Sequence, residues 1–160
     1  MVERLLIMRH GEAAPGRPDA ERELTPRGEE EAQRMGRWLA AREDLDLSRL
    51  RLLASPYVRA RQTAERIAEP LGLAVEPLPI ITPDDPPESV LEWLLGEVED
   101  RPLMLVSHMP LVGMLSGLLV EGRADRGPGF PTGAVAELDA DVFAAGCARL
   151  ARFTAPTDLN

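Results

Sequence analysis

Hydrophobic and polar residues alternate along this chain in blocks that are typical of strands and helices in turn. Short continuous apolar runs, such as Leu5–Met8 and Leu103–Val106, indicate strands that are buried on both faces of a sheet. Between these runs apolar residues recur at helical spacing, as Ala32, Met35 and Leu39 do. The pattern predicts strands at about 3–8, 51–54, 73–78, 103–106, 134–140 and 147–153, and helices at about 26–42, 55–72, 86–99 and 110–120.

The order of these segments predicts the architecture of the protein. Strands that alternate with helices favour an α/β fold with a largely parallel sheet that is covered on both faces. We therefore expect a three-layer α/β/α sandwich with a mostly parallel central sheet, to which the closing segments add an antiparallel strand at one edge. A chain of 160 residues without repeats or linkers is typical of one domain, so residues 1–160 are expected to form a single domain.

Polar residues and prolines predict where the first two helices begin and end. Thr25 is the expected N-cap of the first helix, with Pro26 at its first position. Ser55 is the expected N-cap of the second helix, which should end at Pro70 and Gly72.

The third helix follows two acidic residues. Asp85 and Glu88 are three positions apart and predict a capping box, a use that would leave neither carboxylate free for chemistry. Along this helix the spacing places five apolar side chains toward the core: Val90, Leu91, Leu94, Leu95 and Val98.

The charged residues exclude several classes of function. The net charge of −9, from 27 acidic and 18 basic residues, argues against a nucleic-acid partner, because such proteins need basic surface. All 18 basic residues are arginines, so a Walker-type P-loop and a Schiff-base lysine are excluded. Two histidines are too few for a typical metal site, and no acidic cluster has ligand spacing; we expect no metal and no cofactor.

The single cysteine and the longest apolar stretch indicate where the protein works. Cys147 cannot form an internal disulfide, which suits the cytoplasm. It is expected to be buried, since a cysteine-nucleophile phosphatase would need an arginine six positions later, where Phe153 stands. The stretch 103–120 has no charged arginine, aspartate or glutamate, but His108 and Pro110 interrupt it, which favours strand, break and helix over a membrane span. The first residues have no signal-peptide pattern.

Candidate chemistry lies where the predicted strands end. Arg9 and His10 follow the first strand, His108 follows the strand at 103–106, and Arg59 lies one turn into the second helix. In open α/β sheets ligands bind beyond the carboxyl ends of the strands. One such histidine would usually be a loop residue, and Arg59 alone could be a surface arginine. Both histidines of the chain in equivalent places indicate a shared anion site.

These residue types suit phosphoryl transfer. Arginine guanidinium groups bind phosphate oxygens through paired hydrogen bonds, and helix N-termini, as expected at Pro56 and Pro110, attract anions. Neutral imidazole is a competent nucleophile near pH 7. A second histidine held protonated beside it would stabilise charge on the phosphoryl oxygens.

Four stretches of the chain resemble the histidine phosphatase superfamily, which includes phosphoglycerate mutases and acid phosphatases. The sequence "RHGE" at 9–12 resembles its signature, and "RELTPRGEEEA" at 22–32, "ASPYVRARQTAERIA" at 54–68 and "LVSHMPLVGML" at 105–115 resemble its later motifs. The resemblance covers nearly the whole chain. The last motif and the short length are most similar to the SixA-type phosphohistidine phosphatases of this family.

The resemblance implies a role for each candidate residue. His10 would be the nucleophile that is transiently phosphorylated, and Arg9 and Arg59 would bind the phosphoryl oxygens. His108 would complete the pocket. Arg22 would lie at the pocket rim and bind substrate there.

The resemblance also implies a substrate class. Family members that cleave oxygen esters use an acidic residue as a general acid, for which this chain offers Asp84 as a weak candidate; Glu12 is expected to support the first turn. A phosphorus–nitrogen bond needs less help from an acid. We therefore expect a cytoplasmic phosphohistidine phosphatase acting on a partner protein. Two alternatives are a phosphatase of small phosphorylated metabolites and a non-catalytic phosphoryl-binding module. No nucleic-acid or membrane partner is expected, and the oligomeric state is left open, with a monomer compatible.

Overall fold

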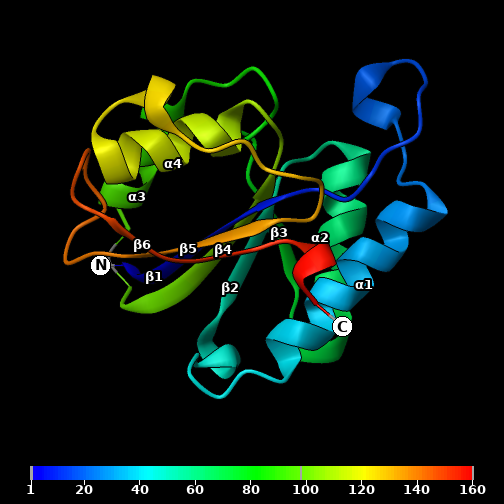
Figure 1. Cartoon of the computed structure of the whole chain (residues 1–160), viewed down its shortest axis with the longest axis horizontal. Coiled ribbons are helices and arrows are strands. Elements are labelled where there is room, and N and C mark those ends of the chain that lie inside the picture. The colour runs from blue at the N-terminus through cyan, green and yellow to red at the C-terminus, as the bar shows by residue number, and fades with distance from the viewer. Residues whose placement is uncertain (1, 98, 160) are drawn as a thin grey trace.

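The computed structural model describes residues 2–97 and 99–159, which fold around a six-stranded sheet (Figure 1). Its strands are β1 (Val2–Arg9), β2 (Arg51–Ala54), β3 (Val75–Pro77), β4 (Arg101–Ser107), β5 (Val135–Asp139) and β6 (Arg149–Thr154). The helices are α1 (Pro26–Ala40), α2 (Val58–Leu71), α3 (Pro87–Leu95) and α4 (Leu111–Glu121). Each element predicted from the sequence is present, with bounds that differ by a few residues.

The sheet is mixed, in the order β3-β2-β4-β1-β5-β6. The first four strands in this order run parallel to one another. β5 pairs antiparallel with β1, and β6 pairs antiparallel with β5. The prediction of a mostly parallel sheet with an antiparallel edge is confirmed, and the antiparallel part contains both closing strands.

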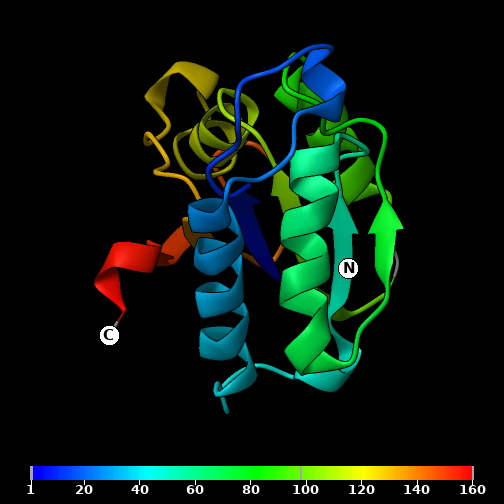
Figure 2. The same cartoon turned by 90° about the vertical axis from the view of Figure 1, so that its right-hand side faces the viewer.

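Helices cover both faces of the sheet and make three layers, as predicted. Figure 2 shows α1 and α2 side by side in front of the sheet, and Figure 1 shows α3 and α4 on the opposite side. Alternate residues of β1 divide between the two cores: Leu6 and Met8 belong to the core beneath α1 and α2, whereas Leu5 and Ile7 belong to the core beneath α3 and α4. All four side chains are fully buried.

The predicted starts of α1 and α2 have different outcomes. Thr25 caps α1 as predicted, because its Oγ1 accepts a hydrogen bond from the Gly28 amide at 3.0 Å. The prediction for Ser55 is wrong, since α2 begins only at Val58, with Tyr57 as its N-cap. Ser55 is instead buried at the end of β2, where its hydroxyl contacts His108.

The end of α2 agrees with the prediction at Gly72 and differs from it at Pro70. Pro70 lies inside the helix, and the chain leaves the helix at Gly72, whose φ of +66° is in the left-handed region. Pro70 removes one backbone N–H donor from the last turn, and the helix continues for only one residue beyond it.

The predicted capping box before α3 is wrong. The N-cap is Pro86, which has no side-chain cap, so Glu88 lies in the first turn without that partner. The Asp85 carboxylate accepts hydrogen bonds from the Thr82 amide at 2.8 Å and from the Thr82 hydroxyl at 2.6 Å. Asp85 therefore closes the turn that leads into the helix.

The inner face of α3 is shorter than the spacing predicted. Val90 and Leu94 are buried and Leu91 is half-buried, as expected. Leu95 is 49% exposed, because the helix ends there and turns its last residue away from the sheet. Val98 lies outside the described residues.

Two further predictions concern surface and membrane. Cys147 is exposed, so the prediction of burial is wrong; it lies in the turn before β6, with its Sγ 3.5 Å from Ala145 O.

The stretch 103–120 divides into β4 and α4 as predicted. Within 2–97 and 99–159 we find no helix with the length and apolar character to cross a membrane.

Candidate active site

The two histidines meet because β1 and β4 are parallel neighbours in register. Arg9 pairs with Ser107 across these strands, so the residues that follow, His10 and His108, leave the sheet side by side. Their ring centroids are 5.0 Å apart, with the planes inclined by 62°. The sequence prediction that both histidines share one site is thus matched by their placement.

His10 is held in one tautomer. Its Nδ1 lies 2.6 Å from Gly11 O, and a carbonyl only accepts, so Nδ1 carries the proton. Nε2 then has a free lone pair, which accepts a hydrogen bond from Arg59 Nε at 3.3 Å. Burial above all, with smaller effects of the Arg59 and Arg9 charges, lowers the pKa of His10 to about 4, although the Gly11 contact raises it in part. At neutral pH His10 is therefore an uncharged imidazole with an available nitrogen.

His108 is also neutral in the free site. Burial, with smaller effects of His10 and Arg59, lowers its pKa to about 3. The sequence analysis expected the second histidine to be protonated where it stabilises charge on the phosphoryl oxygens; without a phosphoryl group, burial keeps this ring neutral. Its Nε2 lies 2.8 Å from Ser55 Oγ, which itself accepts from the Tyr57 amide at 3.2 Å. The Ser55 hydroxyl can donate to His108 Nε2, and in that arrangement the ring proton is on Nδ1.

Arg9 reaches the site from the last position of β1. Its Nη1 donates to Phe130 O at 2.7 Å. Burial lowers the pKa of Arg9, an effect that Glu31 opposes, and the guanidinium stays charged at neutral pH. Arg9 Nε and His108 Nδ1 are both buried and have no hydrogen-bond partner among the described residues.

Arg59 reaches the site from the first turn of α2, as the backward lean of helical side chains predicts. It is buried and lies over the Tyr57 ring, with its central carbon 5.2 Å from the ring centroid. Besides the bond to His10, it donates from Nη1 to Asp19 O at 2.7 Å and from Nη2 to Asp19 Oδ2 at 3.1 Å. Arg22 donates to the same carboxylate, at Oδ1, over 3.0 Å.

These side chains line one cavity of about 340 Å³ at the carboxyl ends of β1 and β4. Its walls are Arg9, His10, Glu12, Ala13, Arg22, Arg59, His108, Met109 and Thr132. All five predicted site residues line it, Arg22 included. With three arginines and one carboxylate on its walls, the cavity favours an anion.

The weak candidate for a general acid is not part of this cavity. Asp84 is exposed and does not line it. Glu12 does line it, and its carboxylate accepts from the Thr25 hydroxyl at 2.9 Å and lies 3.8 Å from Arg27. Glu12 therefore supports the first turn, as expected.

Two acidic residues of this region were missed by the sequence analysis. Asp19 lies in the short turn Asp19–Glu21 between β1 and α1, and Glu31 lies in α1. Glu31 accepts from the Glu12 amide at 2.8 Å and from the Thr132 hydroxyl at 3.0 and 2.9 Å. Both residues sit in stretches rich in acids, and nothing in their spacing distinguishes them from surface residues.

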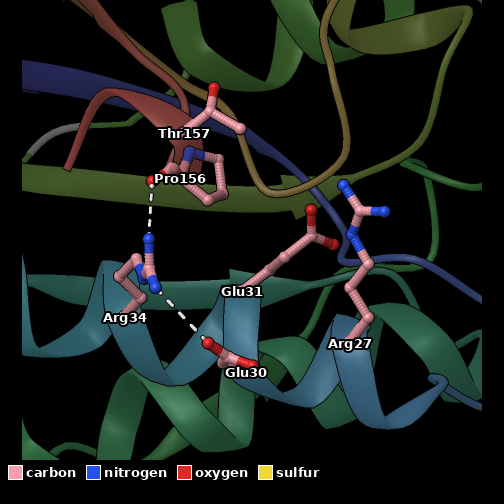
Figure 3. Close-up of a pocket in the computed structure, with 6 residues that line it drawn as sticks. All are labelled: Arg27, Glu30, Glu31, Arg34, Pro156 and Thr157. Atoms are coloured by element: carbon pink, nitrogen blue, oxygen red, sulfur yellow. Dashed lines mark hydrogen bonds and ion pairs between the residues drawn. The ribbon is translucent and has the colours of Figure 1, made fainter. Parts of the chain in front are cut away.

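Glu31 lines a different cavity, of about 290 Å³. Figure 3 shows its lining, which is Arg27, Glu30, Glu31, Arg34, Pro156 and Thr157. Arg34 closes one end by donating to Pro156 O at 3.4 Å and to Glu30 at 3.3 Å. Within the described parts of the chain we find no group of three or more histidine, cysteine or acidic side chains that could hold a metal ion.

Known proteins share this sequence pattern and fold. The sequence profile of the Histidine phosphatase superfamily (branch 1) matches residues 5–82. Phosphohistidine phosphatase SixA of Escherichia coli (strain K12) is 34% identical over 142 residues, which are 86% of this chain and 85% of that protein. A solved structure of the protein histidine phosphatase SixA complexed with tungstate superposes with a TM-score of 0.82 at 32% identity, covering 97% of this chain and 98% of that chain.

A second curated relative agrees with the first. The phosphohistidine phosphatase SixA homolog of Haemophilus influenzae is 37% identical over 118 residues, which are 68% of this chain and 72% of that protein. Fold, site and relatives together define a phosphatase. The chain belongs to the histidine phosphatase superfamily, whose members react through a phosphohistidine intermediate, and it is homologous to SixA. The resemblance inferred from four sequence motifs is confirmed.

Proposed function

We propose that this protein hydrolyses phosphohistidine on a partner protein through a covalent intermediate at His10. One observation carries the proposal: two buried polar atoms, Arg9 Nε and His108 Nδ1, lack partners among the described residues, and both side chains line the same cavity. Buried polar groups without hydrogen bonds are rare in folded proteins because each costs free energy. A bound phosphoryl group would supply acceptors for these atoms. The names of the two curated relatives support phosphohistidine as the substrate.

The proposed reaction has two steps. The Nε2 lone pair of His10 attacks phosphorus, and the phosphorus–nitrogen bond of the substrate breaks. The leaving imidazole keeps the electron pair of that bond, and it departs neutral when its other ring nitrogen already carries a proton. Water then attacks phosphorus on His10, the bond between phosphorus and Nε2 breaks, and its electron pair returns to Nε2. The protons of water leave with inorganic phosphate, and His10 is again a neutral imidazole.

The other residues would bind the charge that moves in these steps. Arg9 and Arg59 would hold the phosphoryl oxygens with charge-assisted hydrogen bonds, and Arg22 would extend this contact at the rim. His108, with its proton on Nδ1, would donate to a phosphoryl oxygen even as a neutral ring. A bound phosphate dianion would also raise the pKa of His108, because it favours the charged form.

Trapping the intermediate tests the role of His10. Rapid quench with labelled phosphohistidine substrate should yield acid-labile, base-stable phosphate on the protein. The His10→Ala variant should yield none, while its far-UV circular dichroism stays native. Label on any other residue, or label retained in His10→Ala, would contradict the assignment.

Three further proposals concern the domain organisation, the location and the need for a metal. We propose that residues 1–160 act as one domain, which is supported by the two cores on opposite faces of one sheet. We also propose a cytoplasmic location, for which the single unpaired cysteine is the supporting observation. The arginines and imidazoles that line the cavity would suffice for the chemistry without a metal.

A further inference from the structure

Asp19 places a carboxylate between two of the arginines that the proposed function assigns to phosphate. Its Oδ1 accepts from Arg22 Nη1 at 3.0 Å, and its Oδ2 accepts from Arg59 Nη2 at 3.1 Å. Its backbone carbonyl accepts from Arg59 Nη1 at 2.7 Å. Because Arg59 Nε donates to His10, each of the three guanidinium nitrogens of Arg59 already donates one hydrogen bond in the free protein.

The Asp19 carboxylate is charged under ordinary conditions. The hydrogen bond from Arg22, followed by that from Arg59, lowers the pKa of Asp19. The side chain of Asp19 is 56% exposed, whereas that of Arg59 is 5% exposed. The Asp19 carboxylate thus lies on the solvent side of the buried Arg59 guanidinium.

A carboxylate bridging two guanidinium groups makes the same kind of contact as a phosphate. An incoming phosphate dianion must share Arg22 and Arg59 with the Asp19 carboxylate. Two anions bound to the same guanidinium groups also repel each other. Both effects weaken anion binding, whether Asp19 stays in place or moves aside.

We propose that Asp19 is a specificity-determining counter-anion that weakens the binding of free phosphate to this site. When a larger partner carries the phosphoryl group, the other contacts of that partner offset this loss of binding free energy. Inorganic phosphate makes no such contacts. Asp19 would therefore favour a macromolecular phosphoryl group and assist release of the phosphate product. This inference rests on the proposed function, since it assumes that Arg59 and Arg22 bind phosphate.

Direct binding of inorganic phosphate tests the proposal without requiring turnover. Titration calorimetry would compare the full chain with Asp19→Asn, which removes the charge and keeps the shape. Glu21→Gln is the matched control, because it removes one charge from the same short turn at a residue that is exposed. We expect Asp19→Asn to bind phosphate about tenfold more tightly, a gain limited by water screening of this exposed carboxylate, and Glu21→Gln to change little.

The outcomes separate the two proposals. If Asp19 only positioned Arg59, its removal would weaken phosphate binding, so unchanged or weaker binding in Asp19→Asn overturns the counter-anion. An equal gain in Glu21→Gln also overturns it, because the effect would then come from net charge. If phosphate binds none of the three proteins, the phosphoryl site itself is wrong, and the proposed function fails with the inference.

Discussion

At the scale of single residues, burial sets the protonation states of both histidines. His10 is 7% exposed and His108 is 1% exposed, and desolvation disfavours the charged imidazole in each. The charges of Arg59 and Arg9 lower the pKa of both histidines, and that of Arg22 lowers the pKa of His10. The result is a neutral nucleophile beside a neutral donor, in surroundings that are already positive.

The two histidines should titrate far below the usual range. Proton NMR can follow both rings, since these are the only histidines of the chain. We expect midpoints of about 4 for His10 and about 3 for His108, against about 6.5 for both in urea-unfolded protein. Added phosphate should raise the midpoint of His108. A midpoint near 6.5 in the folded protein would contradict the assignment of burial as the dominant cause.

The same shifts predict how stability depends on pH. Between pH 6.5 and about 4 the unfolded chain binds protons at both histidines and the folded chain does not. The free energy of unfolding therefore rises with pH across this window and falls as the solution is acidified. Urea denaturation at several pH values measures this slope.

Arg59 and its neighbour Arg61 form a matched pair for mutation. Both lie in α2, but Arg59 contacts His10, whereas Arg61 is exposed and lies 3.5 Å from Glu65. Removing a group that binds the transferring phosphoryl typically costs about 3 kcal/mol, so Arg59→Ala should lose at least about a hundredfold in kcat/KM. Arg61→Ala should stay within about twofold, because an exposed ion pair contributes little. Near-normal activity of Arg59→Ala with native circular dichroism would remove Arg59 from the site.

At the scale of elements, the start of α1 and the loop after β1 pack backbone against backbone. A Cβ on Gly28 would overlap with Glu12 O, and a Cβ on Gly11 would lie 2.5 Å from Gly28 O. These two glycines allow the helix to approach the loop that orients His10. The contact explains why the first two motifs of the chain act as one structural unit.

Gly28→Ala should disturb this contact and reduce both stability and activity. Overpacking of this kind typically costs about 1–3 kcal/mol, and the displaced loop should lower kcat as well. Gly96→Ala is the control, since a Cβ there meets nothing closer than 3.5 Å and its φ is −82°. Urea denaturation should show Gly96→Ala within about 0.5 kcal/mol of the parent. If both variants unfold at the parent's midpoint, the close packing is not needed.

At the scale of the whole molecule, the antiparallel edge is tied to the α1 side by a buried ion pair. Glu137 of β5 is 1% exposed, and its carboxylate accepts from Arg42 at 2.8 and 2.9 Å. Arg42 follows α1 and lies 5.0 Å from the centroid of the Trp38 ring. This pair lies among the closing strands, while the strand ends that form the cavity come from β1 and β4.

The substrate class is also a property of the whole molecule, because it depends on which side chains the fold brings to the cavity. Asp84 is not among them, and Glu12, the one carboxylate on the cavity wall, is engaged by the Thr25 hydroxyl and Arg27, so an oxygen ester with a poor leaving group would lack a free acid. We expect fast cleavage of phosphohistidine, slow cleavage of an aryl phosphate and almost none of phosphoserine. Asp84→Asn should change phosphohistidine turnover by less than about tenfold. Fast phosphoserine hydrolysis that collapses in Asp84→Asn would favour a metabolite phosphatase instead.

The sequence by itself determined the order of elements and the sheet type, and it predicted five residues that the structure brings to one cavity. Apolar runs and helical spacing are local patterns, and a motif such as "RHGE" contains Arg9 and His10 as neighbours in the chain. What the tertiary structure decided depends on residues far apart in the chain. From the sequence Ser55 is expected to be a helix cap, but in the folded chain its hydroxyl contacts His108. Asp19 is expected to be an ordinary loop residue, but its carboxylate binds Arg59 and Arg22. The neutral state of His108 was decided in the same way, because its pKa depends on burial and on charges that only the folded chain brings together.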